Sequence, residues 1–83
     1  MLENLQEKLQ RLRWQCRRGM LELDLILLAF LEKNYLNLSA ADQKLFERLL
    51  TYSDQDLYCY LIKRQPSENV AMQVLIEQVN CGR

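Results

Sequence analysis

The chain contains no histidine and only two glycines among its 83 residues. Without histidine it cannot build a Ser-His-Asp triad, an imidazole general base or a facial metal triad. Two glycines cannot form the glycine-rich loops that bind phosphate groups or dinucleotides. We therefore expect that the chain is not an enzyme and that it binds no cofactor by itself.

The three cysteines, Cys16, Cys59 and Cys81, are widely spaced and form no CxxC pair. Without histidine they do not complete a zinc site, and their odd number favours reduced thiols. Two arginines follow Cys16 and could lower its pKa. Because Cys16 falls on the apolar stripe of a predicted helix, we expect a buried structural thiol rather than a nucleophile.

The charge is balanced overall, with 11 basic and 11 acidic residues. Residues 1–20 carry five basic and two acidic residues, a local net charge of +3. We interpret this arm as a solvated helix face rather than a nucleic-acid site. The longest apolar run, Leu25 to Leu31, has seven residues, whereas a membrane span needs about 20. No signal segment is visible, which favours a bacterial cytoplasmic protein; a processed organellar form would look the same.

Hydrophobic spacing predicts helices throughout and no strand. With 49% hydrophobic residues, the chain is long enough for one core and too short for two. We expect one all-α domain over residues 1–83, a compact five-helix bundle. The first helix has an apolar stripe of Leu5, Leu9, Leu12 and Cys16.

Trp14 points away from this stripe by about half a turn. We expect a later helix to cover it, because an isolated exposed tryptophan is unusual outside binding surfaces. The alternative is an exposed side chain on such a surface.

A second helix is predicted from Gly19 to Lys33. Its run from Leu25 to Leu31 is apolar on every side, so we expect a central helix surrounded by neighbours. Residues 34–38 are predicted to form a loop that Tyr35, Leu36 and Leu38 pack against the core.

Three further helices are predicted from caps and apolar pairs. Ser39 with Asp42 is typical of one helix start, and Ser53 with the acids Asp54 and Asp56 of the next. Pro66 suits the first position of a fifth helix, with Ser67 as a competing cap. The buried positions that we expect are Leu45, Phe46, Leu49 and Leu50 in the third helix, Leu57, Tyr58 and Leu61 in the fourth, and Val70, Val74, Leu75 and Val79 in the fifth. Residues 80–83 are predicted to fray.

The segment from Arg18 to Glu22 is the strongest candidate for a docking surface. Gly19 admits backbone dihedrals that other residues resist and lets two helices meet closely. If the second helix begins near Arg18, Arg18 and Glu22 share a face beside the bare backbone of Gly19. Arg11 and Trp14 would lie on the same side if the first helix extends to Arg18. The alternative is an ordinary exposed ion pair, which contributes little.

The same residues carry a resemblance to a known family. Arg18-Gly19-Met20-Leu21-Glu22 resembles the RGxxE signature of the succinate dehydrogenase flavinylation factors, also called the SdhE or assembly factor 2 family. Trp14, four residues before the arginine, fits the same pattern, as do the Cys-Arg-Arg-Gly-Met run, Phe46-Glu-Arg-Leu-Leu50 and the segment from Asp54 to Tyr58. The similarity covers about residues 10–64 and, more weakly, the last helix. One departure is Gln55, where we associate a proline with bacterial members.

The resemblance implies a five-helix protein that binds the flavoprotein subunit of succinate dehydrogenase or fumarate reductase and promotes covalent attachment of FAD. FAD would belong to that client, and the free chain would be monomeric. The implied contact residues are Arg18, Gly19 and Glu22. The partner-binding surface that we assign comprises Trp14, Arg17, Arg18, Gly19, Met20, Glu22, Asp54 and Asp56. We expect Gly19→Arg or Arg18→Ala to weaken client binding and leave the fold intact.

Two other functions remain open at this point. A small helical protein with charges of both signs also suits an antitoxin-like regulatory module that binds a protein partner. Nucleic-acid binding through the basic arm would require strongly salt-dependent association, and we do not expect it.

Overall fold

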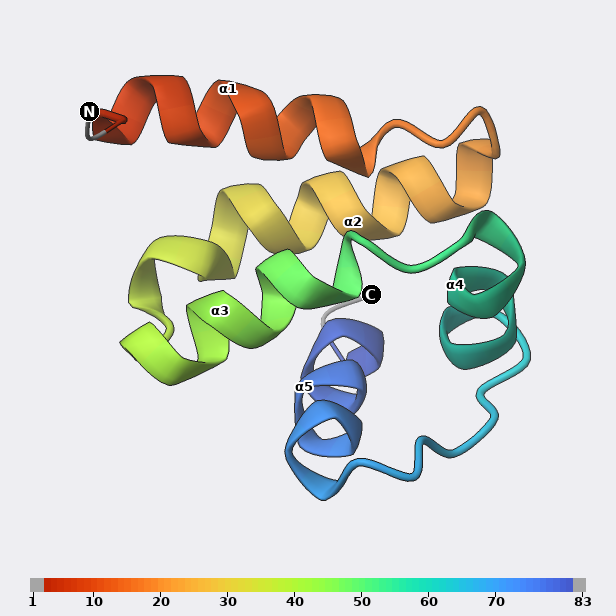
Figure 1. Cartoon of the computed structure of the whole chain (residues 1–83). Helices are drawn as coiled ribbons and strands as arrows, with labels where there is room; N and C mark the ends of the chain where they lie inside the picture. Colours follow the sequence, from red (N-terminus) through yellow and green to blue (C-terminus); the bar gives the residue numbers. More distant parts are fainter. Residues whose placement is uncertain (1–2, 82–83) are drawn as a thin grey trace.

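The structure, a computed structural model, describes residues 3–81. Over this range the chain forms five α-helices and one short 3-10 helix, with no strand, which confirms the predicted all-α fold (Figure 1). The elements in chain order are α1 (Leu5–Cys16), α2 (Leu21–Asn34), the 3-10 helix η1 (Tyr35–Asn37), α3 (Ala40–Leu49), α4 (Asp54–Leu61) and α5 (Val70–Cys81).

Helix α2 is the central element, as its apolar run predicted. It contacts α1, η1, α4 and α5. Figure 1 shows α1 lying antiparallel to α2, with α3 and α5 on the opposite side of α2. The turn between α1 and α2 lies at the same end of the molecule as α4.

All five α-helices and η1 contribute to one hydrophobic core. The aromatic ring of Phe46 packs between Phe30 and Tyr35, with centroid separations of 5.3 and 5.8 Å. Offset ring pairs at such distances stabilise a core beyond the area they bury. The buried residues are Leu12, Cys16, Leu23, Leu27, Phe30, Leu31, Tyr35, Phe46, Leu49, Leu50, Leu57, Leu61, Met72, Leu75, Ile76 and Val79.

In α1 the predicted apolar stripe is confirmed except at its first residue. Leu12 and Cys16 are fully buried and half-buried Leu9 packs against the core, whereas Leu5 is exposed. The prediction that a later helix covers Trp14 is wrong, because its side chain is 74% exposed. Among the described residues the main helix that packs along α1 is α2, and it lies against the Leu12 face, opposite Trp14.

Helix α2 begins at Leu21, two residues later than predicted. It is not surrounded: Leu21 and Leu25 are exposed. A helix that is apolar all round has more hydrophobic surface than three neighbouring helices can cover in so small a protein. The predicted loop after α2 is a 3-10 turn in which Tyr35 is buried and Leu36 is exposed.

The predicted caps of α3 and α4 are confirmed. The Ser39 hydroxyl accepts the backbone N–H of Asp42 at 3.2 Å, and the Ser53 hydroxyl accepts that of Asp56 at 3.1 Å. These bonds satisfy N–H groups that have no partner inside the helix. Buried Phe46, Leu49 and Leu50 and half-buried Leu45 confirm the predicted inner face of α3.

For α5 both the predicted start and part of the predicted face are wrong. The helix begins at Val70, and Asn69 caps it by accepting the N–H of Met72 at 3.0 Å. Val70 and Val74 are exposed; Met72 and Ile76 are buried with Leu75 and Val79. Of the predicted fraying segment, Asn80 and Cys81 are helical and residues 82–83 lie outside the described range.

No helix within residues 3–81 is both long enough and apolar enough to cross a membrane.

Candidate protein-binding surface

The signature residues lie in and after a four-residue loop, residues 17–20, which we call the α1–α2 loop. The loop leaves α1 where the Arg17 N–H donates to the Trp14 carbonyl at 3.1 Å. It enters α2 where the Asp24 N–H donates to the Met20 carbonyl at 2.9 Å. The Asp24 carboxylate accepts the Arg18 N–H at 2.6 Å. Both ends and the middle of the loop are therefore fixed by hydrogen bonds.

The Arg18 side chain is turned inward and is only 16% exposed. Its Nε donates to the Gln15 carbonyl at 2.9 Å, and its Nη1 donates to the Tyr52 carbonyl at 3.0 Å. Nη1 also contacts the Asp54 carboxylate at 3.3 Å, and Nη2 donates to the Leu50 carbonyl. The guanidinium thus joins the α1–α2 loop to the connection between α3 and α4.

This geometry corrects the predicted arrangement of the signature. Because α2 begins at Leu21, Arg18 and Glu22 do not share a helix face. In the described part of the chain no hydrogen bond or ion pair links them; Arg18 pairs with Asp54 instead. Arg18 does not extend the face of α1 that carries Arg11 and Trp14 either, since α1 ends at Cys16.

Gly19 is the exposed apex of the loop. Its φ of +79° lies in the left-handed region that side chains with a Cβ disfavour. A Cβ built at this position would meet no heavy atom within 4 Å. The glycine is therefore required by backbone conformation, and the space beside it is open for a partner to approach the backbone.

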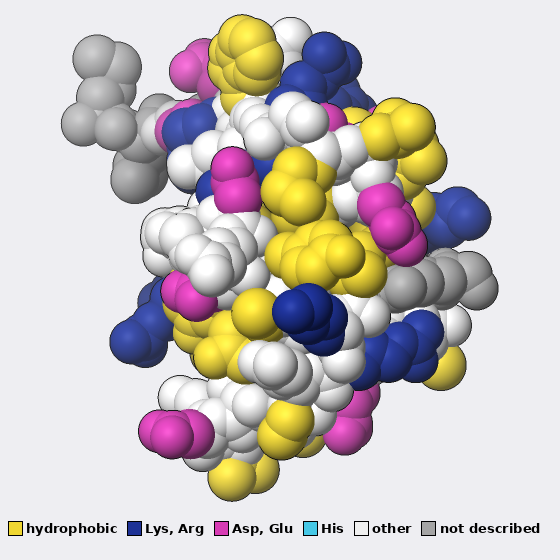
Figure 2. Space-filling model, turned by 90° about the vertical axis from the view of Figure 1, so that its right-hand side faces the viewer, with side chains coloured by type: hydrophobic (Ala, Val, Ile, Leu, Met, Phe, Trp, Pro, Cys, Tyr) yellow, Lys and Arg dark blue, Asp and Glu magenta, His cyan; other side chains and the backbone are white. Residues whose placement is uncertain are grey.

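Trp14 and Arg17 present side chains beside the loop. With Gln10 and Arg13 they line a shallow hollow on the outer side of α1. Figure 2 shows the face of the molecule that carries the α1–α2 turn and α4, where hydrophobic groups lie among basic and acidic ones. Tryptophan and arginine are both among the residues that are enriched at interface hot spots.

Of the remaining predicted site residues, one packs against the core and three are exposed. Met20 is half-buried and packs against the core. Asp54 and Asp56 are exposed in the first turn of α4, where negative charge favours the helix dipole. Glu22 is exposed in the first turn of α2. The structure therefore brings Arg18 and Asp54 together and leaves Glu22 apart from them.

The buried position of Cys16 opposes a nucleophilic role for its thiol. Burial raises the pKa of the Cys16 thiol to about 12; nearby Arg18 lowers it in part and Asp24 raises it further. A thiol with this pKa holds almost no thiolate near neutral pH. All three cysteines are free, and within residues 3–81 no cluster of three or more metal-ligating side chains occurs.

Comparison with known proteins identifies the family. Residues 10–81 match the model of the Sdh5 family, described as the flavinator of succinate dehydrogenase. The chain belongs to this family. It is also similar to curated proteins that are each named FAD assembly factor SdhE, including those from Haemophilus ducreyi, Pseudomonas savastanoi pv. phaseolicola and Pseudomonas putida. The one from Haemophilus ducreyi is 38% identical over 72 residues, which cover 87% of this chain and 88% of the relative. The one from Pseudomonas savastanoi pv. phaseolicola is 40% identical over 72 residues, which cover 87% of this chain and 86% of the relative. The one from Pseudomonas putida is 41% identical over 71 residues, 86% of this chain and 84% of its own length. Among solved structures no match was found.

Sequence reasoning missed the groups that hold the Sdh5 signature in place. The nearby carbonyl of Gln15 and the distant carbonyls of Leu50 and Tyr52 bind the Arg18 side chain. Backbone acceptors carry no side-chain signal, so no residue pattern could have identified them. Asp24 lies inside the predicted second helix, but its bond to the Arg18 N–H requires a loop between the two helices that was not predicted.

Proposed function

We propose that this chain is an FAD assembly factor. It binds the flavoprotein subunit of succinate dehydrogenase or fumarate reductase and promotes the covalent attachment of FAD to that subunit. The observation that carries the proposal is the match of residues 10–81 to the flavinator family, with the RGxxE signature in and after a hydrogen-bonded loop whose Gly19 apex is exposed. Relatives at 38–41% identity bear the name FAD assembly factor.

The proposed mechanism is selective binding of one conformer of the client. A protein that binds one conformation more tightly shifts the population toward it by that difference in affinity, without any catalytic group of its own. The Gly19 apex lets the client approach the backbone, and Trp14 and Arg17 flank it with exposed side chains. In this proposal the chain is not an enzyme.

The signature residues have different roles in this mechanism. Arg18 is a positioning residue, because its guanidinium holds the α1–α2 loop against the α3–α4 connection. Glu22 and the open side of Gly19 face outward and are available to the client. The flavin belongs to the client, because a chain with two glycines has no glycine-rich phosphate loop. We further propose that the free protein is a cytoplasmic monomer.

The test is covalent flavin on a succinate dehydrogenase flavoprotein subunit, read as in-gel fluorescence after denaturation. The subunit is produced with no factor, with this chain and with its Gly19→Arg and Gly19→Asn variants. Asparagine tolerates the left-handed conformation better than most other side chains. Gly19→Asn therefore adds a short side chain with little backbone strain, whereas Gly19→Arg adds both strain and a long side chain at the surface. We expect fluorescence to rise with the wild-type chain, to rise less with Gly19→Asn and to stay at the no-factor level with Gly19→Arg. Equal fluorescence with and without the wild-type chain would overturn the proposal.

A further inference from the structure

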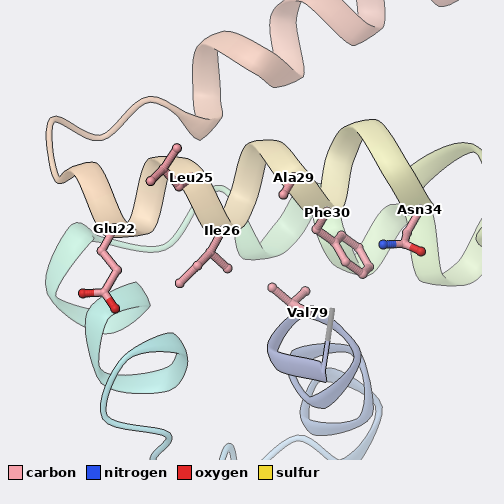
Figure 3. A pocket seen from close by; sticks show the side chains of 7 residues that line it. All are labelled: Glu22, Leu25, Ile26, Ala29, Phe30, Asn34 and Val79. Carbon is pink, nitrogen blue, oxygen red and sulfur yellow. The ribbon is translucent and has the colours of Figure 1, made fainter. Parts of the chain in front are cut away.

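Helix α2 leaves an apolar groove uncovered along its side next to α5. The groove has a volume of about 310 Å³, and its lining is contributed by α2 except for Val79 of α5. In Figure 3 Ile26 and Phe30 project from α2 toward α5, and Val79 faces them from the opposite wall. Because no other element within residues 3–81 covers this side, apolar surface remains exposed where a partner would bury it.

The two ends of the groove are polar. Glu22 stands at the end nearest α4, and Asn34 stands at the other end (Figure 3). Within residues 3–81 no hydrogen bond or ion pair to Glu22 is formed, and its side chain is exposed. The lining contains one carboxylate and no cation: Glu22, Leu25, Ile26, Ala29, Phe30, Asn34 and Val79.

We propose that this groove binds an apolar segment of the client flavoprotein that carries a lysine or arginine beside its apolar side chains. The apolar side chains fill the space over Ile26, Ala29 and Phe30, and the cation pairs with the Glu22 carboxylate. This inference rests on the proposed function and extends its interface from the α1–α2 loop along α2. Glu22 joins the two parts, since it is three residues from the Gly19 apex and forms the rim of the groove.

The charge of the groove favours the client over a second copy of this chain. A symmetric dimer places the same surface patch of both copies against each other. Two copies of this groove would bring two Glu22 carboxylates to an apolar interface without a cation among the lining residues. Burying an unpaired charge is strongly unfavourable. A partner that supplies the missing cation satisfies the carboxylate, whereas self-association on this face does not.

The first experiment fills the groove. Ala29→Trp places an indole over the groove floor, whereas Ala41→Trp places the same side chain on the exposed surface of α3, outside the groove. Binding of the purified flavoprotein subunit is titrated by calorimetry, and circular dichroism monitors the fold. We expect Ala29→Trp to weaken binding by about tenfold or more, the range of an interface hot spot, and Ala41→Trp to leave it unchanged.

The outcomes separate this inference from the proposed function. If the wild-type chain binds and Ala29→Trp binds equally well, the groove is not part of the interface and the proposed function stands. If the wild-type chain binds no flavoprotein subunit, both fail. If Ala29→Trp unfolds the protein, Leu25→Gln on the exposed rim of the groove decides, with exposed Val70→Gln of α5 as the matched control. Loss of affinity in Leu25→Gln alone supports the groove, and equal affinity of the two variants overturns it.

The second experiment identifies the occupant. Leu25, on the exposed rim of the groove, is replaced by photoreactive p-benzoylphenylalanine, with exposed Val70 of α5 as the control position. We expect a crosslink from position 25 to a flavoprotein peptide that is apolar and contains lysine or arginine, and none from position 70. A crosslink to a second copy of this chain, or to a peptide without a basic residue, would overturn the inference.

Discussion

At the scale of single residues, Arg18 connects the ends of three helices. Its guanidinium binds the Gln15 carbonyl near the end of α1, the Leu50 carbonyl at the end of α3 and the Asp54 carboxylate at the start of α4. Helix C-termini leave carbonyl groups without partners and attract positive charge. The planar fork of arginine can bind several such acceptors at once, which the single ammonium of lysine cannot.

Replacement of Arg18 should therefore lower stability as well as binding. We expect Arg18→Ala to reduce the free energy of unfolding by about 2–3 kcal/mol, because several partly buried acceptors lose a charged donor. Urea titration followed by circular dichroism measures the change. Exposed Arg17→Ala is the matched control and should shift the free energy by less than about 0.5 kcal/mol.

An Arg18→Ala variant as stable as the wild type would show that these bonds contribute nothing and that the arginine acts on the client directly. The free energy of unfolding of Arg18→Lys should lie between those of the wild type and Arg18→Ala, because lysine keeps the charge but lacks the planar guanidinium. This expectation replaces the one drawn from the sequence, in which Arg18→Ala leaves the fold unaffected.

At the scale of the elements, α5 begins at an asparagine cap rather than at proline. The Asn69 carboxamide accepts the Met72 N–H. The preceding turn is held by the Gln73 side chain, which accepts the Ser67 N–H at 2.6 Å. Pro66 lies in the exposed connection before this turn. The start of α5 is therefore fixed by the Asn69 cap in front of the helix and by the Gln73 side chain, which reaches back from within it.

We expect Asn69→Ala to lower the free energy of unfolding by about 1 kcal/mol, the usual cost of removing an N-cap acceptor. Pro66→Ala should change it by only a few tenths of a kcal/mol, because Pro66 is outside the helix. Thermal unfolding of both variants distinguishes a helix α5 that is capped by Asn69 from one that begins at Pro66. A larger loss in Pro66→Ala than in Asn69→Ala would favour the start predicted from the sequence.

A polar network ties α1 and η1 to α3. The Tyr35 hydroxyl donates to the Glu47 carboxylate at 2.6 Å, and Lys8 Nζ lies 3.1 Å from the same oxygen. Burial acts to raise the pKa of Glu47, but the hydrogen bonds from Tyr35 and Lys8 outweigh it and hold the pKa below its ordinary value of 4.5. The charged carboxylate therefore stabilises the folded state.

A lowered carboxyl pKa gives stability that is present above the unfolded pKa and is lost as pH falls through the folded pKa. We expect Glu47→Gln to unfold at lower urea than the wild type near neutral pH, and the difference to shrink on acidification to about pH 3. The control Glu32→Gln removes an exposed carboxylate that pairs loosely with Arg13 at 3.7 Å. Its difference from the wild type should be small at both pH values. If the difference in stability between Glu47→Gln and the wild type were the same at both pH values, loss of the Glu47 charge would not be its cause.

How well the sequence predicted each element depended on how local its determinants are. The Ser39 and Ser53 caps were predicted correctly, because each bond joins residues three positions apart. The buried face of α5 was predicted only in part. Apolar residues occur on several sides of that helix, so their spacing does not decide whether Val74 or Ile76 faces inward; packing against α2, α3 and α4 does.

The candidate site follows the same rule. The signature was recognised from residues that are adjacent in the sequence. In the structure Gly19 adopts a positive φ, which explains why a glycine is needed there. The inward turn of Arg18 could not be predicted, because all of its acceptors except the Gln15 carbonyl lie more than 30 positions further along the chain. The exposure of Trp14 and the groove beside α2 depend on which faces the other helices leave uncovered, and no local pattern contains that information.

At the scale of the whole molecule, one core holds the first and last described helices together within extents of 37 × 27 × 22 Å. Cys16 lies in that core, Cys59 is half-buried and Cys81 is exposed. The three thiols therefore differ in how far they are buried. A buried thiol reacts only when the structure around it opens, so its reaction rate reports the free energy of that opening.

We expect a thiol reagent to modify Cys81 at once, Cys59 more slowly and Cys16 only on global unfolding. In a Cys59→Ser, Cys81→Ser variant, Cys16 should react at least about a thousandfold more slowly under native conditions than in urea, as a global stability of about 5 kcal/mol implies. Arg18→Ala in the same background should speed the reaction by the factor that its loss of stability predicts, because Arg18 closes the loop directly after Cys16. Fast native labelling of Cys16 would instead mean that the α1–α2 loop opens alone, and that the surface proposed for the client is not held rigid by the core.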